Sequence, residues 1–491
     1  MKTLAKQILC LCLSLVLVLG LSACGSSGAA SSKKAELLSM DARPDAPSEI
    51  PEGLDIDWNY RYTFAELESQ LSKMAEAYPD ITALYSIGTS WQERDFWCME
   101  ITNKAIPAEE KTGIGVFANI HGGERESASS AMYTAWWLTL CSGDDYVKGL
   151  LDNYIIYIIP VINPDGYEQS FVINNRPNLR PRDANGDNIP YSDPYTDIDG
   201  DGFIATLYRG KTDDTPSRDL PVFGMESPDW DENGILGDDP RTSGIDMNRT
   251  FDYQWNRYDI ETKDGQQVGN VNWTTAGTAP ATEPEIKALQ QFMYEHEIDA
   301  LVSLHTGIQS VLYPWCYRAY DADDPKDAEI PFMKETASQM AQAFQNYTGR
   351  GFYSMSSNED YPTAAELIDY AYGRYNIHAY TIEVYSPGKS EDGDISACKW
   401  ENTMPEAKWV FYSRDDIRDK LGLDPDAITG KDGVGLAADE GLWFYTSPTN
   451  QMVNRAPEEQ DVMVRGCRDA ILTMIESEPS GNGYQNPGYY K

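Results

Sequence analysis

Apolar and polar residues follow two different periods along the chain, and these predict strands and helices in turn. Runs that are apolar at nearly every position predict buried strands at 114–120, 154–162, 300–304 and 379–384. Apolar residues at helical spacing predict helices at 126–140, 283–297, 330–345 and 458–475. Continuous apolar strands that alternate with helices are typical of sheets buried on both faces. The pattern therefore predicts an α/β fold, with a mixed, mostly parallel, twisted β-sheet and helices on both faces.

Another helix is predicted from its capping residues. Thr63 and Glu66 have the spacing of a capping box, in which each side chain accepts a hydrogen bond from the other residue's backbone N–H. Phe64, Leu67 and Leu71 follow at helical spacing. We therefore expect a helix that begins directly after Thr63.

Two stretches interrupt the alternation of strands and helices. Residues 177–244 are rich in Asp and Gly and poor in apolar residues, and residues 386–454 are similarly irregular. We interpret both as loop-rich insertions, either long loops or small subdomains, carried by the main sheet. The folded domain is then expected at 52–477, followed by a tail at 478–491.

The residues before the domain have the features of a targeting segment. Two lysines precede an apolar run at 8–21, and Cys24 follows small residues. This order is typical of a secretory signal and resembles that of a bacterial lipoprotein. We predict a signal peptide at 1–23, lipidation of Cys24 and a flexible tether at 24–51, which together place the protein outside the cytoplasm on the cell membrane. A transmembrane anchor is the alternative, although the apolar run is short for a span.

Charge and cysteine content narrow the class of partner. The chain has 78 acidic and 39 basic residues, a net charge of −39, which argues against a nucleic-acid partner and for solubility outside the cell. No C-x-x-C spacing suggests a metal knuckle. Disulfide pairing stays open for the cysteines other than Cys24 that follow the signal: Cys98, Cys141, Cys316, Cys398 and Cys467.

A candidate metal site lies in the segment His121-Gly122-Gly123-Glu124. Its His and Glu are three positions apart, directly after a predicted strand, and His305 follows another strand. A catalytic zinc ion usually takes three protein ligands, often two His and one Glu, and leaves a fourth position for water. Since acidic residues are common in this chain, the His-x-x-Glu spacing is a weak signal by itself.

Polar residues follow each of the four predicted strands. His121, Asn163 and His305 come directly after three of them, and Glu383 lies near the end of the fourth. Because sites gather at the carboxyl ends of strands in such sheets, we expect these residues to meet. Glu383 is then a candidate general base for a water that zinc makes acidic. A strand glutamate paired with a surface lysine is the alternative.

The order of the motifs resembles that of the carboxypeptidase A family of zinc peptidases. The resemblance runs from about residue 60 to residue 477, apart from the two insertions. The matching segments are His121–Glu124, Asn163-Pro164-Asp165-Gly166-Tyr167, Gly244-Ile245-Asp246-Met247-Asn248-Arg249, Thr282-Glu283-Pro284-Glu285, Tyr361-Pro362 with Asp369-Tyr370, and Tyr380-Thr381-Ile382-Glu383. The resemblance implies that family's fold and one zinc ion, held by its known set of two His and one Glu, here His121, Glu124 and His305.

The same resemblance implies roles for other residues. Asn248 and Arg249 match the pair that holds the free carboxylate of the substrate, Tyr361 matches a mobile tyrosine that caps the substrate, and Glu383 matches the catalytic glutamate. An arginine fork suits a carboxylate, as an exopeptidase requires. The alternatives are a structural salt bridge for Arg249 and a packed aromatic for Tyr361.

Two roles are harder to place. Members of the family have an arginine near the Asn-Pro-Asp-Gly-Tyr turn that stabilises the oxyanion, and Arg176, Arg180 and Arg182 all compete for it where the insertion begins. We choose Arg180. Ile368 aligns with a residue that lines the pocket for the departing side chain, which implies a hydrophobic preference.

Two short stretches suggest a second kind of cation. Residues 183–187 (Asp183 to Asp187) and 197–201 (Asp197 to Asp201) alternate oxygen-bearing side chains, a pattern that suits Ca²⁺. Neither has Glu at position twelve of the loop, which excludes an EF-hand. Calcium loops and solvated acidic turns both remain open.

Together these observations predict a zinc-dependent metallocarboxypeptidase that hydrolyses the C-terminal peptide bond of peptides or proteins. Its substrate partners are peptide C-termini, its membrane contact is lipidated Cys24, and we expect a monomer. One alternative is a cell-wall peptidase of the same fold that acts on peptidoglycan stem peptides. Another is a binding lipoprotein that has lost catalysis, against which the retained candidate ligands and Glu383 argue.

Overall fold

The computed structural model describes residues 42–241, 244–257, 276–385, 406–448, 450 and 460–478. The predicted signal peptide, Cys24 and most of the tether lie outside these residues, as do Cys398 and the tail beyond residue 478. In the part that is described, no helix combines the length and apolarity needed to cross a bilayer.

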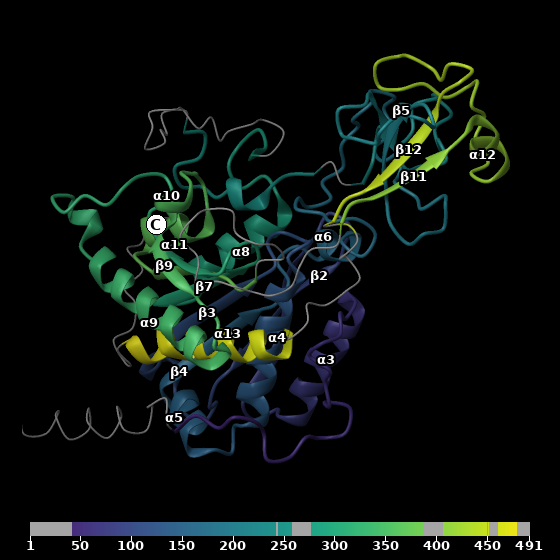
Figure 1. Cartoon of the computed structure of the whole chain (residues 1–491). Coiled ribbons are helices and arrows are strands. Elements are labelled where there is room, and N and C mark those ends of the chain that lie inside the picture. Colours follow the sequence, from purple (N-terminus) through teal and green to yellow (C-terminus); the bar gives the residue numbers. More distant parts are fainter. Residues whose placement is uncertain are drawn as a thin grey trace, which may run out of the picture.

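An eight-stranded sheet forms the centre of the molecule, in the order β1-β2-β4-β3-β7-β10-β8-β9 (Figure 1). The pairs β4–β3, β3–β7, β7–β10 and β8–β9 are parallel, and the other three are antiparallel. The predicted strands are β3, β4, β7 and β10, which lie side by side, and the mixed, mostly parallel sheet is confirmed. The strands are β1 (Thr82–Thr89), β2 (Asp95–Ile101), β3 (Thr112–Ala118), β4 (Tyr154–Ile159), β7 (Ala300–His305), β8 (Ser310–Tyr313), β9 (Tyr353–Ser356) and β10 (His378–Glu383).

Helices cover both faces of this sheet. Alternate residues of β4 enter two separate cores, with Ile156 and Ile158 in one and Ile155 and Ile159 in the other. Two-sided burial explains why the central strands are apolar at nearly every position. The first core is completed by α3 (Phe64–Ala77), α4 (Arg125–Leu140), α5 (Asp145–Asn153), α9 (Ile330–Thr348) and α13 (Gln460–Ser477), and the second mainly by α8 (Pro284–Glu295) and α11 (Leu367–Tyr375).

The predicted capping box is present at the start of α3. The Thr63 hydroxyl accepts a hydrogen bond from the Glu66 N–H, and the Glu66 carboxylate accepts one from the Thr63 N–H at 2.7 Å. Both groups are backbone donors that a helix N-terminus would otherwise leave unpaired. The helix therefore begins at Phe64, as expected.

The two insertions join to form one small subdomain that projects from the main body (Figure 1). Its sheet has the order β11-β12-β5-β6, and β12 of the second insertion pairs antiparallel with β5 of the first. Leu207, Phe223, Ile417 and Phe444 belong to a third core beneath this sheet. The elements are β5 (Thr206–Gly210), β6 (Val222–Met225), β11 (Lys408–Tyr412), α12 (Arg414–Asp419) and β12 (Gly441–Thr446). The composition of the two stretches indicates where they lie in the chain but does not predict that they share a sheet.

The described cysteines do not form disulfides. Cys98, Cys141, Cys316 and Cys467 are all free and buried. Burial raises the pKa of the Cys467 thiol to about 12, so it stays protonated and behaves as a small apolar side chain.

Candidate active site

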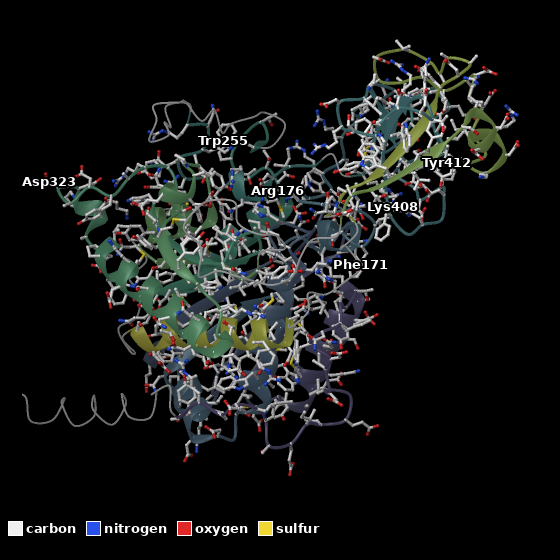
Figure 2. The ribbon with its side chains drawn as sticks, viewed as in Figure 1. Phe171, Arg176, Trp255, Asp323, Lys408 and Tyr412 are labelled. Atoms are coloured by element: carbon white, nitrogen blue, oxygen red, sulfur yellow. The ribbon has the colours of Figure 1, made fainter. Side chains whose placement is uncertain are left out.

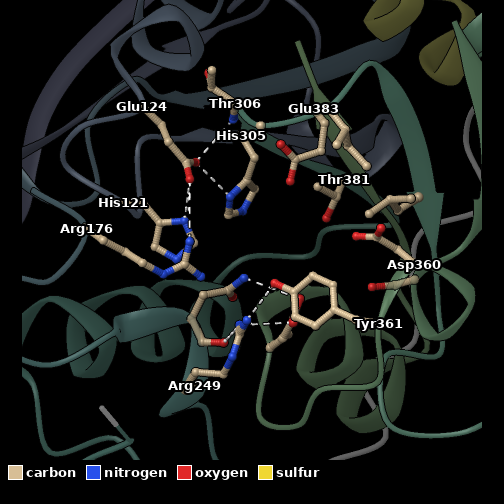
Figure 3. Close-up of a pocket in the computed structure, with 16 residues that line it drawn as sticks. His121, Glu124, Arg176, Arg249, His305, Thr306, Asp360, Tyr361, Thr381 and Glu383 are labelled. Carbon is tan, nitrogen blue, oxygen red and sulfur yellow. Dashed lines mark hydrogen bonds and ion pairs between the residues drawn. The ribbon is translucent and has the colours of Figure 1, made fainter. Parts of the chain in front are cut away.

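The carboxyl ends of the central strands bring the predicted polar residues together. His305 is the last residue of β7, Glu383 is the last residue of β10, and the two are partners in the parallel register. His121 follows β3, the neighbour of β7 on its other side. His121, Glu124, His305 and Glu383 line one cavity of about 230 Å³ (Figure 3). The expected meeting at the edge of the sheet is observed.

The candidate metal ligands converge on one point in this cavity. The Glu124 carboxylate lies between the two imidazoles, 2.8 Å from Nδ1 of His121 and 3.0 Å from Nδ1 of His305. One ligand atom from each residue lies within 4.8 Å of the other two. Two imidazole nitrogens and one carboxylate are the donors of a catalytic zinc site, and they leave room for water. The residues present therefore fit a zinc ion.

Further contacts fix the orientation of both imidazoles. Nε2 of His121 lies 3.1 Å from the Asp246 carboxylate, and Nε2 of His305 lies 3.0 Å from the Ser303 hydroxyl. Such contacts turn Nδ1 toward a metal and fix the tautomer. The sequence alone predicted no role for Asp246, although this residue lies in the same motif as Asn248 and Arg249. Its position two residues before Asn248 in that motif was the available signal.

The surroundings of Glu124 keep it ionised. Burial alone would raise the pKa of this carboxyl, but the adjacent imidazoles of His121 and His305 outweigh burial and hold the pKa below its usual range. An ionised carboxylate is the form that binds a metal ion.

Glu383 is in a different electrostatic environment. Burial raises the pKa of its carboxyl to about 8, and the negative charge of Glu124 adds to this effect. Its Oε2 atom is buried and has no hydrogen-bond partner among the described residues. A carboxylate with a raised pKa and a vacant acceptor beside the candidate metal ligands is suited to take up a proton.

A cluster for an anionic group lies at the other end of the cavity. Arg249 donates to the Tyr361 hydroxyl at 2.9 Å and forms an ion pair of 3.0 Å with Glu366 (Figure 3). The Asn248 side chain accepts from the Leu367 N–H at 3.0 Å and donates to Glu366 at 3.3 Å. Tyr361 is 48% exposed, so its side chain has room to move as a substrate enters. Glu366 was not predicted, and its spacing from Tyr361 gave no signal.

The choice of Arg180 is corrected. The structure pairs Arg180 with Glu283 at 3.0 Å, near Trp91 and outside the cavity lined by the candidate metal ligands. Arg182 is exposed. Arg176 lines that cavity instead and donates to Asp246 at 2.7 Å. Spacing could not separate the three arginines, because the path of the loop decides which one turns inward.

The role expected for Ile368 is also corrected. Its side chain is 1% exposed and packs in the second core, not in the cavity. The apolar lining comes from Ile308 and Leu312, and Asp360 and Glu366 add acidic groups. A hydrophobic preference therefore has no support from Ile368.

Close backbone contacts explain two of the sequence motifs. A Cβ atom on Gly122 would lie only 2.2 Å from the carbonyl carbon of Gly166, so the turn between His121 and Glu124 directly approaches the start of α6 (Pro164–Gln169). Asn163 caps this helix by accepting from the Gly166 N–H at 2.9 Å, and its amide donates to the backbone carbonyl groups of Ile120 and Pro177. The Asn-Pro-Asp-Gly-Tyr turn thus holds two site loops together.

The acidic stretches form compact turns in the subdomain. Carboxylate oxygens of Asp183, Asp187 and Asp239 lie within 4.8 Å of one another, and Asp197, Asp199 and Glu226 form a second such group. In each group the third member comes from another part of the insertion, outside the short loop that the sequence suggested.

Comparison with known proteins identifies the class. The family model of zinc carboxypeptidases, Peptidase_M14, matches residues 67–404, more than half of the chain. The chain therefore belongs to the zinc carboxypeptidase family, whose members are zinc-dependent peptide-bond hydrolases.

Individual relatives are distant. Zinc carboxypeptidase A 1 of Drosophila melanogaster is 24% identical over 325 residues, which cover 65% of this chain and 60% of that protein. Mast cell carboxypeptidase A of Homo sapiens is 21% identical over 370 residues, 72% of this chain and 71% of that protein. The crystal structure of thrombin activatable fibrinolysis inhibitor is 19% identical, with a TM-score of 0.49 and coverage of 71% of both chains.

Proposed function

We propose that this protein is a zinc-dependent metallocarboxypeptidase that removes the C-terminal residue of peptides or proteins. The observation that supports this most is a single cavity that holds both the candidate zinc ligands and, beyond them, Arg249. A metal site alone would fit many hydrolases. A buried guanidinium in the same cavity suits a substrate that ends in a free carboxylate.

Substrate binding follows from the charged groups in the cavity. Arg249 and Asn248 would bind the terminal carboxylate, and the Tyr361 hydroxyl, which already contacts Arg249, would move onto it. The side chain of the terminal residue would then lie among Ile308, Leu312 and the neighbouring acidic groups. Binding in this way places the last peptide bond beside the metal ligands.

Proton transfer is assigned to Glu383. A zinc ion held by His121, Glu124 and His305 would polarise the scissile carbonyl and lower the pKa of water toward neutrality. Glu383 would accept the proton of the attacking water and pass it to the leaving amine. Arg176, which lines the cavity beside His121, would stabilise the negative charge that develops on the carbonyl oxygen.

Mass spectrometry of a mixed peptide pool tests the activity. We expect incubation with the purified domain, from residue 51 onward, to give ladders shortened from the C-terminus, and a zinc chelator to abolish them. The terminal residues lost fastest would show the preferred side chain. An untouched pool would contradict the assignment for free peptides and would favour the peptidoglycan stem peptides as substrates.

Replacing Arg249 with Gln should mainly impair substrates with a free C-terminal carboxylate. Loss of a charge-assisted bidentate contact costs about 3 kcal/mol, or a loss of about 100-fold in kcat/KM. The measurement is kcat/KM for paired peptides with free and amidated C-termini. Equal cleavage of both by the unaltered enzyme would show that it is not an exopeptidase of this kind.

We also propose, from the sequence, that the enzyme is exported and anchored through lipidated Cys24. A signal-like segment and a Ser- and Gly-rich tether support this proposal. Binding of calcium by the acidic turns and a monomeric state likewise stay predictions of the sequence.

A further inference from the structure

A second cavity adjoins the candidate active site on the side away from Arg249. It has a volume of about 310 Å³ and shares His121, Glu124, Arg176, Thr306 and Gly307 with the first cavity. Its lining does not include Asn248, Arg249 or Tyr361. A peptide whose C-terminal residue occupies the first cavity, with its last peptide bond at the metal ligands, must therefore continue into the second. This cavity is the place for the residues that precede the scissile bond.

One cation in this second cavity, Arg125, forms no ion pair within the part of the chain that the structure describes. Arg125 lines the cavity, is 2% exposed, and leaves Nε and Nη1 without a hydrogen-bond partner in that part of the chain. Its guanidinium carbon lies 4.2 Å from the centre of the Phe171 ring, which supports one face of the group (Figure 2 labels Phe171). Buried guanidinium donors are normally paired, so this arrangement indicates a missing acceptor.

The neighbouring charged groups are already engaged. Arg61 pairs with Glu126 at 2.5 Å, and the Glu168 carboxylate accepts from the Phe64 N–H at 2.6 Å. Arg176 pairs with Asp246. Glu126 and Glu168 attract Arg125 electrostatically, but neither accepts a hydrogen bond from its Nε or Nη1.

We propose that Arg125 is the centre of a subsite that binds a substrate carboxylate on the N-terminal side of the scissile bond. Arginine pairs with carboxylates through two parallel hydrogen bonds, and this pair is stronger where water is excluded. Ser170, Asn174 and Asn175 line the same cavity and offer additional polar contacts. The carboxylate has two possible sources: an Asp or Glu side chain in an ordinary peptide, or the free α-carboxylate of a glutamyl residue linked through its side chain. This inference rests on the proposed carboxypeptidase function.

Matched substrates test the subsite. One series carries Glu or Gln at each of the two positions before the C-terminal residue, and a second carries a γ-linked glutamyl residue with its α-carboxylate free or amidated. We expect a preference of about tenfold in kcat/KM for the carboxylate form in at least one series, as one charge-assisted contact provides. The series that shows it identifies the source of the carboxylate.

Variants assign this preference to the arginine. Arg125→Gln should reduce the ratio to about one, and Arg125→Lys, which keeps the charge but lacks the fork, should retain part of it. Because each ratio compares two substrates of the same preparation, it does not depend on the fraction of folded enzyme. Arg418→Gln is the matched control: it removes one positive charge from exposed α12 of the subdomain and should leave the ratio unchanged.

The possible failures are distinguishable. Turnover of the peptides without any preference for a carboxylate would overturn the subsite and leave the carboxypeptidase assignment intact. A preference that survives in Arg125→Gln would likewise overturn the role of Arg125. If Arg125→Gln does not fold, the test compares the ratio of the unaltered enzyme with that of Arg125→Lys. An equal ratio in the two proteins would overturn the role of Arg125. Absence of zinc-dependent turnover for every peptide would overturn both proposals.

Discussion

Replacing Glu383 with Gln should abolish peptide hydrolysis while zinc remains bound. The amide keeps the size of the side chain but cannot accept and pass on a proton, and general acid–base catalysis contributes about 10²–10⁴-fold to such reactions. Since Glu383 is not one of the three candidate ligands whose donor atoms converge, the metal content should not change. The measurement is kcat together with the zinc content of the same preparation.

A stability measurement separates this catalytic effect from a folding defect. Burial raises the pKa of Glu383 to about 8 in the metal-free protein, so folding favours the neutral carboxyl. The contribution of this group to the free energy of unfolding is therefore highest at low pH, where it is neutral in both states, and falls as pH rises toward 8. The neutral amide should avoid this loss, and metal-free Glu383→Gln should be at least as stable as the unaltered protein at alkaline pH. Glu335→Gln, on the exposed face of α9, is the matched control for activity. Full turnover by Glu383→Gln would rule out Glu383 as the base.

Replacing His305 with Ala should remove zinc and, with it, the activity. Three residues converge on the metal position, and a site with only one His and one Glu lacks a donor. Loss of a supporting contact to a ligand already costs about 10–100-fold in affinity, so loss of a ligand should cost more than about 100-fold. Elemental analysis after dialysis against a weak chelator gives the zinc stoichiometry.

A histidine outside the site is available as the control. His296 is the C-cap residue of α8, and its ring stacks on the Phe292 ring with a centroid distance of 4.0 Å. It does not line the cavity of the candidate active site. His296→Ala should therefore keep its zinc even if it loses some stability. Unchanged zinc in His305→Ala would mean that another residue supplies the third ligand.

The local sequence predicted the central strands because their burial leaves a direct mark on composition. Strands such as β4 are covered on both faces, so nearly every position is apolar. The outer strands were not predicted because they are short or only partly buried. β1 is largely half-buried and β9 has only four residues, so neither gives a continuous apolar run.

The sequence also determined which residues could bind the metal, since ligands must have particular chemistry and follow strands whose carboxyl ends meet. His121 and Glu124 are close in the chain, and the parallel register then brings His305 beside them. Motif order added Asn248 and Arg249, which the structure places in the same cavity. These inferences needed only residue type, spacing and the direction of the strands.

Other features were decided by the tertiary structure alone. Arg176 and not Arg180 enters the cavity, and Ile368 points into the core, because the direction of each side chain depends on the path of its loop or the rotation of its helix. The two insertions share a sheet through pairing of β12 with β5, which lie more than 200 residues apart in the chain. The Arg125 guanidinium lacks an ion pair because the nearby carboxylates have other partners. Glu126 pairs with Arg61, and Glu168 accepts a hydrogen bond from the Phe64 N–H. A sequence specifies which groups are available, but packing between distant segments decides which of them meet.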